Sequence, residues 1–407
     1  MDETGGKLTT ESPPVALAAA APPRRAWPSA LLAAMMLYLF IAAIHMMGHG
    51  LKTAAGDPVA QRQIHAVFVF ANVPLAAFCV GLLVTSIVQS SSFTTSLIVA
   101  FVATGQISLP DAIPLIMGAN VGTSITALLV SLGHIRRRRE FRLALAGAAT
   151  HSFFKILTVC VMFPLEAAFG VLSVPAKAAG EWLSRADSFA YDTKQVGVIK
   201  TLVAPLADGF HWLFCDGLGF GPAWAGGLIA IVALVLLFVA LFFLVVGLKG
   251  ALMQRIAGLF SRVLFARPWT GFLIGTMATA LVQSSSVTTS LAVPLLGARV
   301  LGLRKVYPYM LGADVGTTVT AILAAVANAA TIGQPEAAAL GLSVAAAHLL
   351  FNLIGVAIFW PLGQMPMGLG KAFARLASHR RIWVLVGVVG LFFVLPAVAV
   401  AAVWVIG

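Results

Sequence analysis

Two polar runs, each reading Gln-Ser-Ser-Ser, interrupt long apolar segments at residues 89–92 and 283–286. Serine hydroxyls and glutamine amides donate hydrogen bonds without carrying charge. If a helix begins at such a run, its first backbone N–H groups are unpaired, and the helix dipole favours an anion beside them. The two runs therefore predict a binding site for a small tetrahedral oxyanion that needs no arginine.

The predicted anion ligands come from both runs and from polar residues that follow them. Small polar residues also allow helices to pack closely, which is the simpler explanation for any single serine. A duplicated run at two helix starts favours binding instead. The candidate anion ligands are Gln89, Ser90, Ser91, Ser92, Thr94, Asn120, Gln283, Ser284, Ser285, Ser286 and Thr288.

Two glycine-containing segments follow the serine runs, GANVGTS at 118–124 and GADVGTT at 312–318. Glycine permits a helix to unwind within a span. The carbonyl oxygens freed there, together with side-chain oxygens, would suit Na⁺. The candidate sodium ligands are Gln89, Thr123, Ser124, Gln283, Asp314, Thr317 and Thr318.

Asp314 is the residue that most strongly indicates a functional site, because a carboxylate inside an apolar span is costly. It could bind Na⁺, carry a proton or lie at a water-filled loop end. We expect His151 and His348 to be hydrogen-bonded packing residues. Lys155 lies within an expected span and could reach the interface or pair with Glu166.

Composition determines the class of protein that must position these residues. The chain has 407 residues, of which 60% are hydrophobic and only 10% are charged, whereas soluble domains carry roughly 25% charged residues. Apolar runs of span length occur at 27–47, 223–247, 338–360 and 383–405. The net charge of +12 gathers in short loops, as the positive-inside rule expects, so we predict no nucleic acid partner.

The chain contains an internal repeat. Residues 85–99 and 279–293 agree at eleven of fifteen positions, at an offset of 194. The same offset aligns 118–127 with 312–321. A looser match pairs the segments that begin at His151 and His348.

Loop charges indicate that the two repeats are inverted. The loop at 136–139 is all arginine, but its partner at 328–336 has no lysine or arginine. The connector at 104–111 also has none, whereas its partner at 299–305 has three. Matching loops therefore face opposite sides of the membrane, which is typical of transporters.

Each serine run is predicted to form the tip of a re-entrant hairpin. One helix over residues 73–103 would be about 46 Å long, but the hydrocarbon core is only about 30 Å thick. The predicted fold is an all-α membrane protein, an inverted repeat with two re-entrant helical hairpins and broken transmembrane helices. Its predicted parts are a disordered tail at 1–26, repeats at 27–170 and 222–362, a linker loop at 171–221, and a cytoplasmic basic segment with the last span at 363–407.

At these paired blocks the sequence resembles the type II sodium/phosphate cotransporter family. The resemblance covers most of the chain and extends to LYLF at 37–40, REFR at 139–142 and HLLFN at 348–352. It implies Na⁺-driven movement of inorganic phosphate by alternating access. Phosphate would lie between the serine tips, and Na⁺ would bind in the adjacent broken helices.

Three positions depart from the family pattern. Asp314 stands where the family usually has Asn, and Ser152 stands where electrogenic members carry Asp and electroneutral members carry Gly. Lys155 replaces the Asn expected by analogy with Asn352. Asp314 and Ser152 are therefore the coupling candidates, and the number of Na⁺ ions stays open.

Several alternatives remain at this point. They are phosphate export, proton coupling through Asp314, transport of another oxyanion, and a non-transporting membrane scaffold. An enzyme is not expected, since no histidine or lysine is spaced as a base beside either serine run. The linking segment is short and has no Asn-x-Ser/Thr acceptor, which favours the lipid bilayer of a bacterial inner membrane. Oligomeric state is left open.

Overall fold

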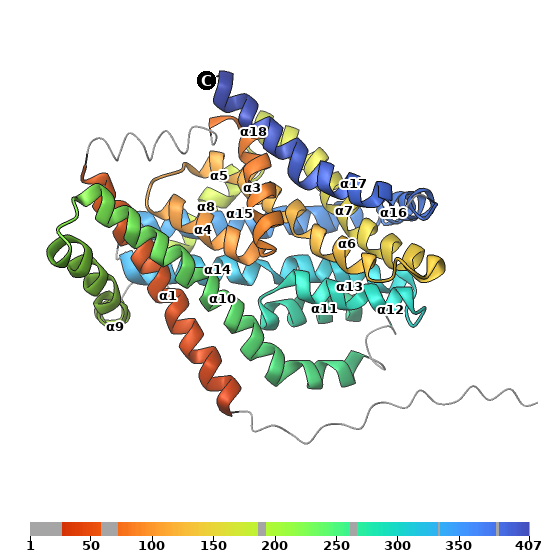
Figure 1. Cartoon of the computed structure of the whole chain (residues 1–407), viewed down its shortest axis with the longest axis horizontal. Helices are drawn as coiled ribbons and strands as arrows, with labels where there is room; N and C mark the ends of the chain where they lie inside the picture. Colours follow the sequence, from red (N-terminus) through yellow and green to blue (C-terminus); the bar gives the residue numbers. More distant parts are fainter. Residues whose placement is uncertain are drawn as a thin grey trace, which may run out of the picture.

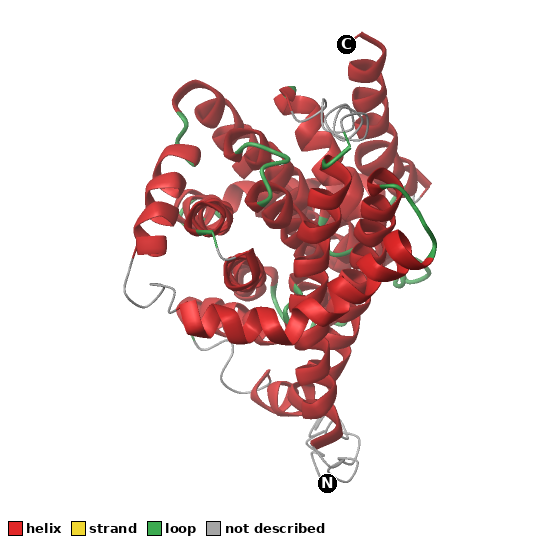
Figure 2. Ribbon diagram, turned by 90° about the vertical axis from the view of Figure 1, so that its left-hand side faces the viewer, coloured by secondary structure: helices red, strands yellow, loops and turns green. Residues whose placement is uncertain are grey.

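The computed structural model describes residues 27–57, 72–185, 193–260, 267–332, 334–379 and 382–406. All regular elements of these residues are helical (Figure 2). Within the described ranges, seven helices are long and apolar enough to cross a membrane. The all-α class is confirmed, and the chain is a multi-pass membrane protein. The predicted tail at 1–26 lies outside the described residues.

The two repeats fold into the same series of helices. Each begins with a long helix, α1 (Trp27–Ala55) or α10 (Pro222–Phe260). The first repeat continues with α3 (Pro74–Val88), α4 (Ser91–Ala103), α5 (Leu109–Gly122), α6 (Ser124–Leu132) and α7 (Arg138–Phe169). The second continues with α11 (Pro268–Val282), α12 (Ser285–Gly297), α13 (Leu303–Gly316), α14 (Thr318–Ile332) and α15 (Pro335–Phe359).

Helices α1 and α10 pack along each other at one side of the bundle (Figure 1). Glycine makes this close crossing feasible. A Cβ atom added at Gly50 would lie 2.8 Å from the backbone oxygen of Gly226, and one at Gly226 would lie 2.5 Å from the backbone oxygen of Gly50. Small residues at helix contacts are how membrane helices approach one another closely.

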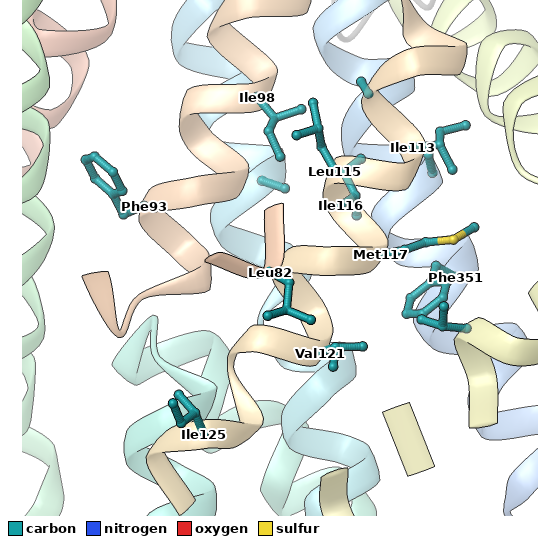
Figure 3. Close-up of a cluster of buried hydrophobic side chains, with 14 of the residues drawn as sticks. Leu82, Phe93, Ile98, Ile113, Leu115, Ile116, Met117, Val121, Ile125 and Phe351 are labelled. Atoms are coloured by element: carbon teal, nitrogen blue, oxygen red, sulfur yellow. The ribbon is translucent and has the colours of Figure 1, made fainter. Parts of the chain in front are cut away.

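The repeats also interlock. Helix α7 of the first repeat packs against α12 of the second, and α15 of the second packs against α4 of the first. The hydrophobic core runs through these contacts, with Met117 of α5 lying beside Phe351 of α15 (Figure 3). The two serine-bearing helices are thus each held by the opposite repeat.

The predicted linker loop at 171–221 is wrong as a loop, because its described part is largely helical. It forms α8 (Ser173–Arg185), α9 (Thr193–His211) and a π-helical turn over Trp212–Gly217. Helix α8 packs against α15. Its charged residues recur every fourth position and leave a small-residue face for that contact, so charge did not exclude a helix.

The segment after the second repeat mirrors this arrangement. Helix α16 (Gln364–Ala377) packs against α7, as α8 packs against α15. The last apolar segment comprises α17 (Ile382–Val389), a π-helical turn at Gly390–Val394 and α18 (Leu395–Ile406). Pro396 occupies the first turn of α18, where proline is tolerated, so it does not end the span.

Candidate functional site

The first serine run separates two short helices. Helix α3 ends at Val88, and Gln89 takes a left-handed backbone conformation with φ 59°. Ser90 is extended, and its hydroxyl accepts a 3.2 Å hydrogen bond from the Phe93 amide. Ser90 is therefore the N-cap of α4, and the predicted helix start is present at this run.

The second run repeats this geometry closely. Gln283 has φ 58°, and the Ser284 hydroxyl accepts a 3.4 Å hydrogen bond from the Val287 amide at the start of α12. Left-handed backbone is uncommon in residues other than glycine, and it concentrates at functional sites. Whether the two helix pairs re-enter the membrane from one face stays a prediction.

Both tip glutamines are held by threonines of the interrupted helices. The Thr126 hydroxyl donates to Gln89 Oε1 at 2.8 Å, and the Thr320 hydroxyl donates to Gln283 Oε1 at 2.7 Å. The amide nitrogen of each glutamine returns to a backbone carbonyl of its own hairpin, at Ser86 or Ala280. Each glutamine therefore fixes the tip to the second part of the interrupted helix of the same repeat, α6 or α14.

The two tips contact each other directly. The Ser92 hydroxyl donates a 2.8 Å hydrogen bond to the backbone carbonyl of Gln283 and lies 3.3 Å from the Thr320 hydroxyl. The mirror bond, from Ser286 to the carbonyl of Gln89, is not formed between these described residues. The structure thus brings both serine runs to one place and breaks their symmetry there.

Buried hydroxyl groups surround the tips. A threonine pair closes each hairpin, with Thr85 donating to Thr94 at 2.9 Å and Thr279 lying 2.7 Å from Thr288. The hydroxyls of Ser285 and Thr317 are buried without a hydrogen-bond partner among the described residues. Buried polar atoms are seldom left unpaired, so these two are available to a bound ion.

The glycine-containing helices are interrupted more narrowly than the sequence suggests. The break is a single residue, Thr123 or Thr317, whose backbone angles stay right-handed and helical. Glycine serves close packing here. A Cβ added at Gly118 or Gly312 would lie 1.9 Å from the backbone oxygen of the neighbouring hairpin helix. Few carbonyl groups are freed, so hydroxyls are the main candidate sodium ligands.

Asp314 lies in a buried charge cluster. His151 Nε2 lies 2.8 Å from Asp314 Oδ2, and Lys155 Nζ lies 2.8 Å from Asp314 Oδ1. All three side chains are at most 2% exposed. Asp314 is therefore not at a water-filled loop end. His151 is hydrogen-bonded, as expected, but neither ring nitrogen of His348 has a hydrogen-bond partner among the described residues, so the expectation is wrong for His348.

The expected pairing of Lys155 with Glu166 is wrong. Glu166 instead accepts hydrogen bonds from the backbone amides of Leu172 and Ser173 and so caps the start of α8. Its carboxylate satisfies amide groups that have no partner within the helix. The only carboxylate that pairs with Lys155 among the described residues is that of Asp314.

The other coupling candidate lies apart from the tips. Ser152 is buried and donates to the backbone carbonyl of Ala148 at 3.2 Å. It lines an apolar cavity of about 250 Å³ between α7 and the last helices. Among the described residues, its hydroxyl makes no hydrogen bond to either serine run.

The Lys155–Asp314 pair is the feature that single-residue reasoning missed. A signal was present in the repeat. Asp314 corresponds to Asn120 and Lys155 corresponds to Asn352, so one repeat position gains a negative charge and another gains a positive one. Two opposite departures from one pattern indicate that the residues contact each other.

Comparison with known proteins supports the transporter reading. The model of the family described as Na⁺/Pi-cotransporter matches residues 39–174 and 236–379. Sodium-dependent phosphate transport protein 2A of Rattus norvegicus is 31% identical over 89% of this chain and 65% of its own length. Sodium-dependent phosphate transport protein 2B of Bos taurus is 30% identical over 90% of this chain and 64% of its own length.

The 2B protein of Homo sapiens is 27% identical over 88% of this chain. The chain thus spans a little under two thirds of the length of the relatives that it matches. No solved structure matches the chain significantly.

Proposed function

We propose, since the chain belongs to the Na⁺/Pi-cotransporter family, that it moves inorganic phosphate across a membrane together with Na⁺. The observation that carries the proposal is the meeting of the two serine tips. Two helix starts with free amide groups and uncharged hydroxyls face one buried place, from opposite repeats. This arrangement suits a small oxyanion whose own charge is met by backbone dipoles.

Phosphate would bind to the amides and hydroxyls of both tips. The proposed ligands are the two glutamines, the six serines, Thr94 and Thr288, with Asn120 as a neighbour from α5. A neutral set of donors suits phosphate because HPO₄²⁻ can also donate a hydrogen bond. The unpartnered Ser285 hydroxyl supplies one donor that needs no other contact to be broken.

Sodium would bind beside the tips, to hydroxyls of the interrupted helices and to the side-chain oxygens of the tip glutamines. The proposed ligands are Gln89, Gln283, Thr123, Ser124, Thr317 and Thr318. Thr317 is the strongest of these, because its hydroxyl is buried and has no hydrogen-bond partner in the described part of the chain. Asp314 is left out of this set, since Lys155 and His151 already occupy its oxygens.

Alternating access between the two repeats and a bacterial inner-membrane location are part of the same proposal. The family consists of transporters, so the serines are proposed as ligands and not as nucleophiles.

The first test measures uptake of radiolabelled phosphate into proteoliposomes that contain the purified chain. We expect uptake to require an inward Na⁺ gradient. Equal uptake when choline replaces Na⁺ would contradict sodium coupling, and dependence on a pH gradient would favour proton coupling. Uptake of sulfate at the phosphate rate would contradict the proposed selectivity.

A second test addresses the tips themselves. Ser90→Ala and Ser284→Ala remove one cap and one hydroxyl from each helix start, and we expect phosphate uptake to fall by at least tenfold in each. Normal uptake by folded variants would contradict the proposed ligand role and favour serine runs that serve only packing. Size-exclusion chromatography establishes folding in both cases.

A further inference from the structure

The mirror image of the buried charge cluster carries no charge pair. In one half-site, α13 contributes Asp314 and α7 contributes His151 and Lys155. In the other, α5 contributes Asn120 and α15 contributes His348 and Asn352, and all three are at most 2% exposed. The two half-sites occupy matching places in the repeat, because α7 packs against α13 as α15 packs against α5.

The contacts in the mirror half-site are those of neutral side chains. Asn120 donates to the backbone carbonyl of Ile116, and Asn352 donates to that of His348, both at 3.1 Å. The fold therefore tolerates an uncharged version of this half-site. The aspartate and the lysine are consequently a matched addition, and neither charge alone is a requirement of packing.

A buried carboxylate needs a cation beside it. In a sodium-driven transporter, that cation could be a Na⁺ ion that binds and leaves with each cycle. Here Lys155 Nζ lies 2.8 Å from Asp314 Oδ1, and His151 occupies the other oxygen. A Na⁺ ion at Asp314 would have to displace an ammonium group or lie beside it, where the two positive charges repel each other.

We propose that the Lys155 ammonium is a permanent internal cation for Asp314 and takes the place of one co-transported Na⁺. The inference rests on the proposed function. The side chain is covalently attached, so its charge stays with the protein through the cycle. The Asp314 half-site then contributes no Na⁺ to the coupling ratio, and transport draws only on the sodium sites at the tips.

The test is the ratio of ²²Na⁺ to radiolabelled phosphate taken up by proteoliposomes. Lys155→Asn reproduces the asparagine of the mirror half-site and leaves Asp314 without its ammonium. We expect the ratio to rise by about one Na⁺ per phosphate, because Na⁺ takes the free position. The matched control is Lys155→Asn combined with Asp314→Asn, which is neutral and should keep the wild-type ratio.

A stability measurement gives a readout that does not depend on transport. NaCl should raise the melting temperature of detergent-purified Lys155→Asn more than that of the wild type or the double variant, since a bound ion stabilises the folded state. The same increment in all three proteins would overturn the proposal, as would an unchanged flux ratio in Lys155→Asn.

Two outcomes separate this inference from the proposed function. If the wild type shows no Na⁺-dependent phosphate uptake, the proposed function fails. If the wild type is coupled and Lys155→Asn keeps its ratio, only the inference fails. Should Lys155→Asn not fold even in NaCl, D314K combined with K155D carries the test, because the exchanged pair must keep the wild-type ratio and a lower ratio overturns the proposal.

Discussion

At the scale of single residues, the tip glutamines combine a backbone and a side-chain function. Their left-handed conformation ends one helix, and only the glutamine and the N-cap serine separate that helix from the next. Their side chains meanwhile accept a hydrogen bond from Thr126 or Thr320. Glycine could adopt the backbone turn more easily, but it could not hold the adjacent helix.

Ser92→Ala tests the contact between the tips. It removes the hydrogen bond to the Gln283 carbonyl, a loss of about 0.5–1.5 kcal/mol in stability, and it frees the tips from each other. We expect a higher KM for phosphate and a lower melting temperature. The control is Ser131→Ala, which removes a buried hydroxyl bonded only to its own helix on α6. An equal phosphate KM in both variants would contradict the role of the contact.

Asp314→Asn tests the charge cluster by stability alone. The change leaves the Lys155 ammonium buried without its carboxylate, and breaking a buried pair in this way costs about 3–5 kcal/mol. We expect a large fall in melting temperature. Adding Lys155→Asn should restore most of it, because no charge then remains unpaired. Additive losses in the double variant would contradict a direct pairing.

At the scale of helices, glycine determines how closely the hairpins approach their neighbours. Gly118 of α5 faces the backbone oxygen of Phe78, and Gly312 of α13 faces that of Phe272. The obstacle in each case is backbone, which cannot turn aside as a side chain can. Helices α5 and α13 can therefore pack closely against the hairpins only because Gly118 and Gly312 have no side chain.

Gly118→Ala should therefore displace α5 from α3. Its Cβ would lie 1.9 Å from a carbonyl oxygen, and overpacking of this kind costs about 1–3 kcal/mol or more. We expect little folded protein and no phosphate uptake. Gly227→Ala on α10 is the matched control, because a Cβ there meets no atom within 4 Å. Thermal unfolding compares the two, and equal stability would contradict the packing argument.

The sequence predicted the helices and the tips better than it predicted the contacts between them. The repeat located both serine runs, and the N-caps at Ser90 and Ser284 follow from local residue types. The helices of the linker were not predicted, because charged residues in a segment do not exclude a helix that places them on one face. The ion pair of Asp314 was missed because its partner lies 159 residues away in the chain.

At the scale of the whole molecule, neither repeat completes its own site. Helix α15 supports α4, α7 supports α12, and the helices α8 and α16 each pack on the opposite repeat. The apolar core spans both repeats and includes Met117 and Phe351. Such sharing predicts that the two repeats fold as one cooperative unit.

Separate expression of residues 1–189 and 190–407 tests this sharing. We expect each half alone to aggregate in detergent, because its interlocking helices would lack their partners. Co-expressed halves should purify together through a tag on one of them and should transport phosphate. A half that is stable and monodisperse by itself would contradict the interlocked arrangement.

The bond between Ser92 and Gln283 has no counterpart between Ser286 and Gln89. The two tips thus have unequal roles, since Ser92 of the first donates the hydrogen bond and the carbonyl of Gln283 in the second accepts it. The two tips are alike in sequence at this point, but the hydrogen bond between them runs in one direction only in this structure. An ion bound between the tips would therefore act on a contact whose two sides are unequal.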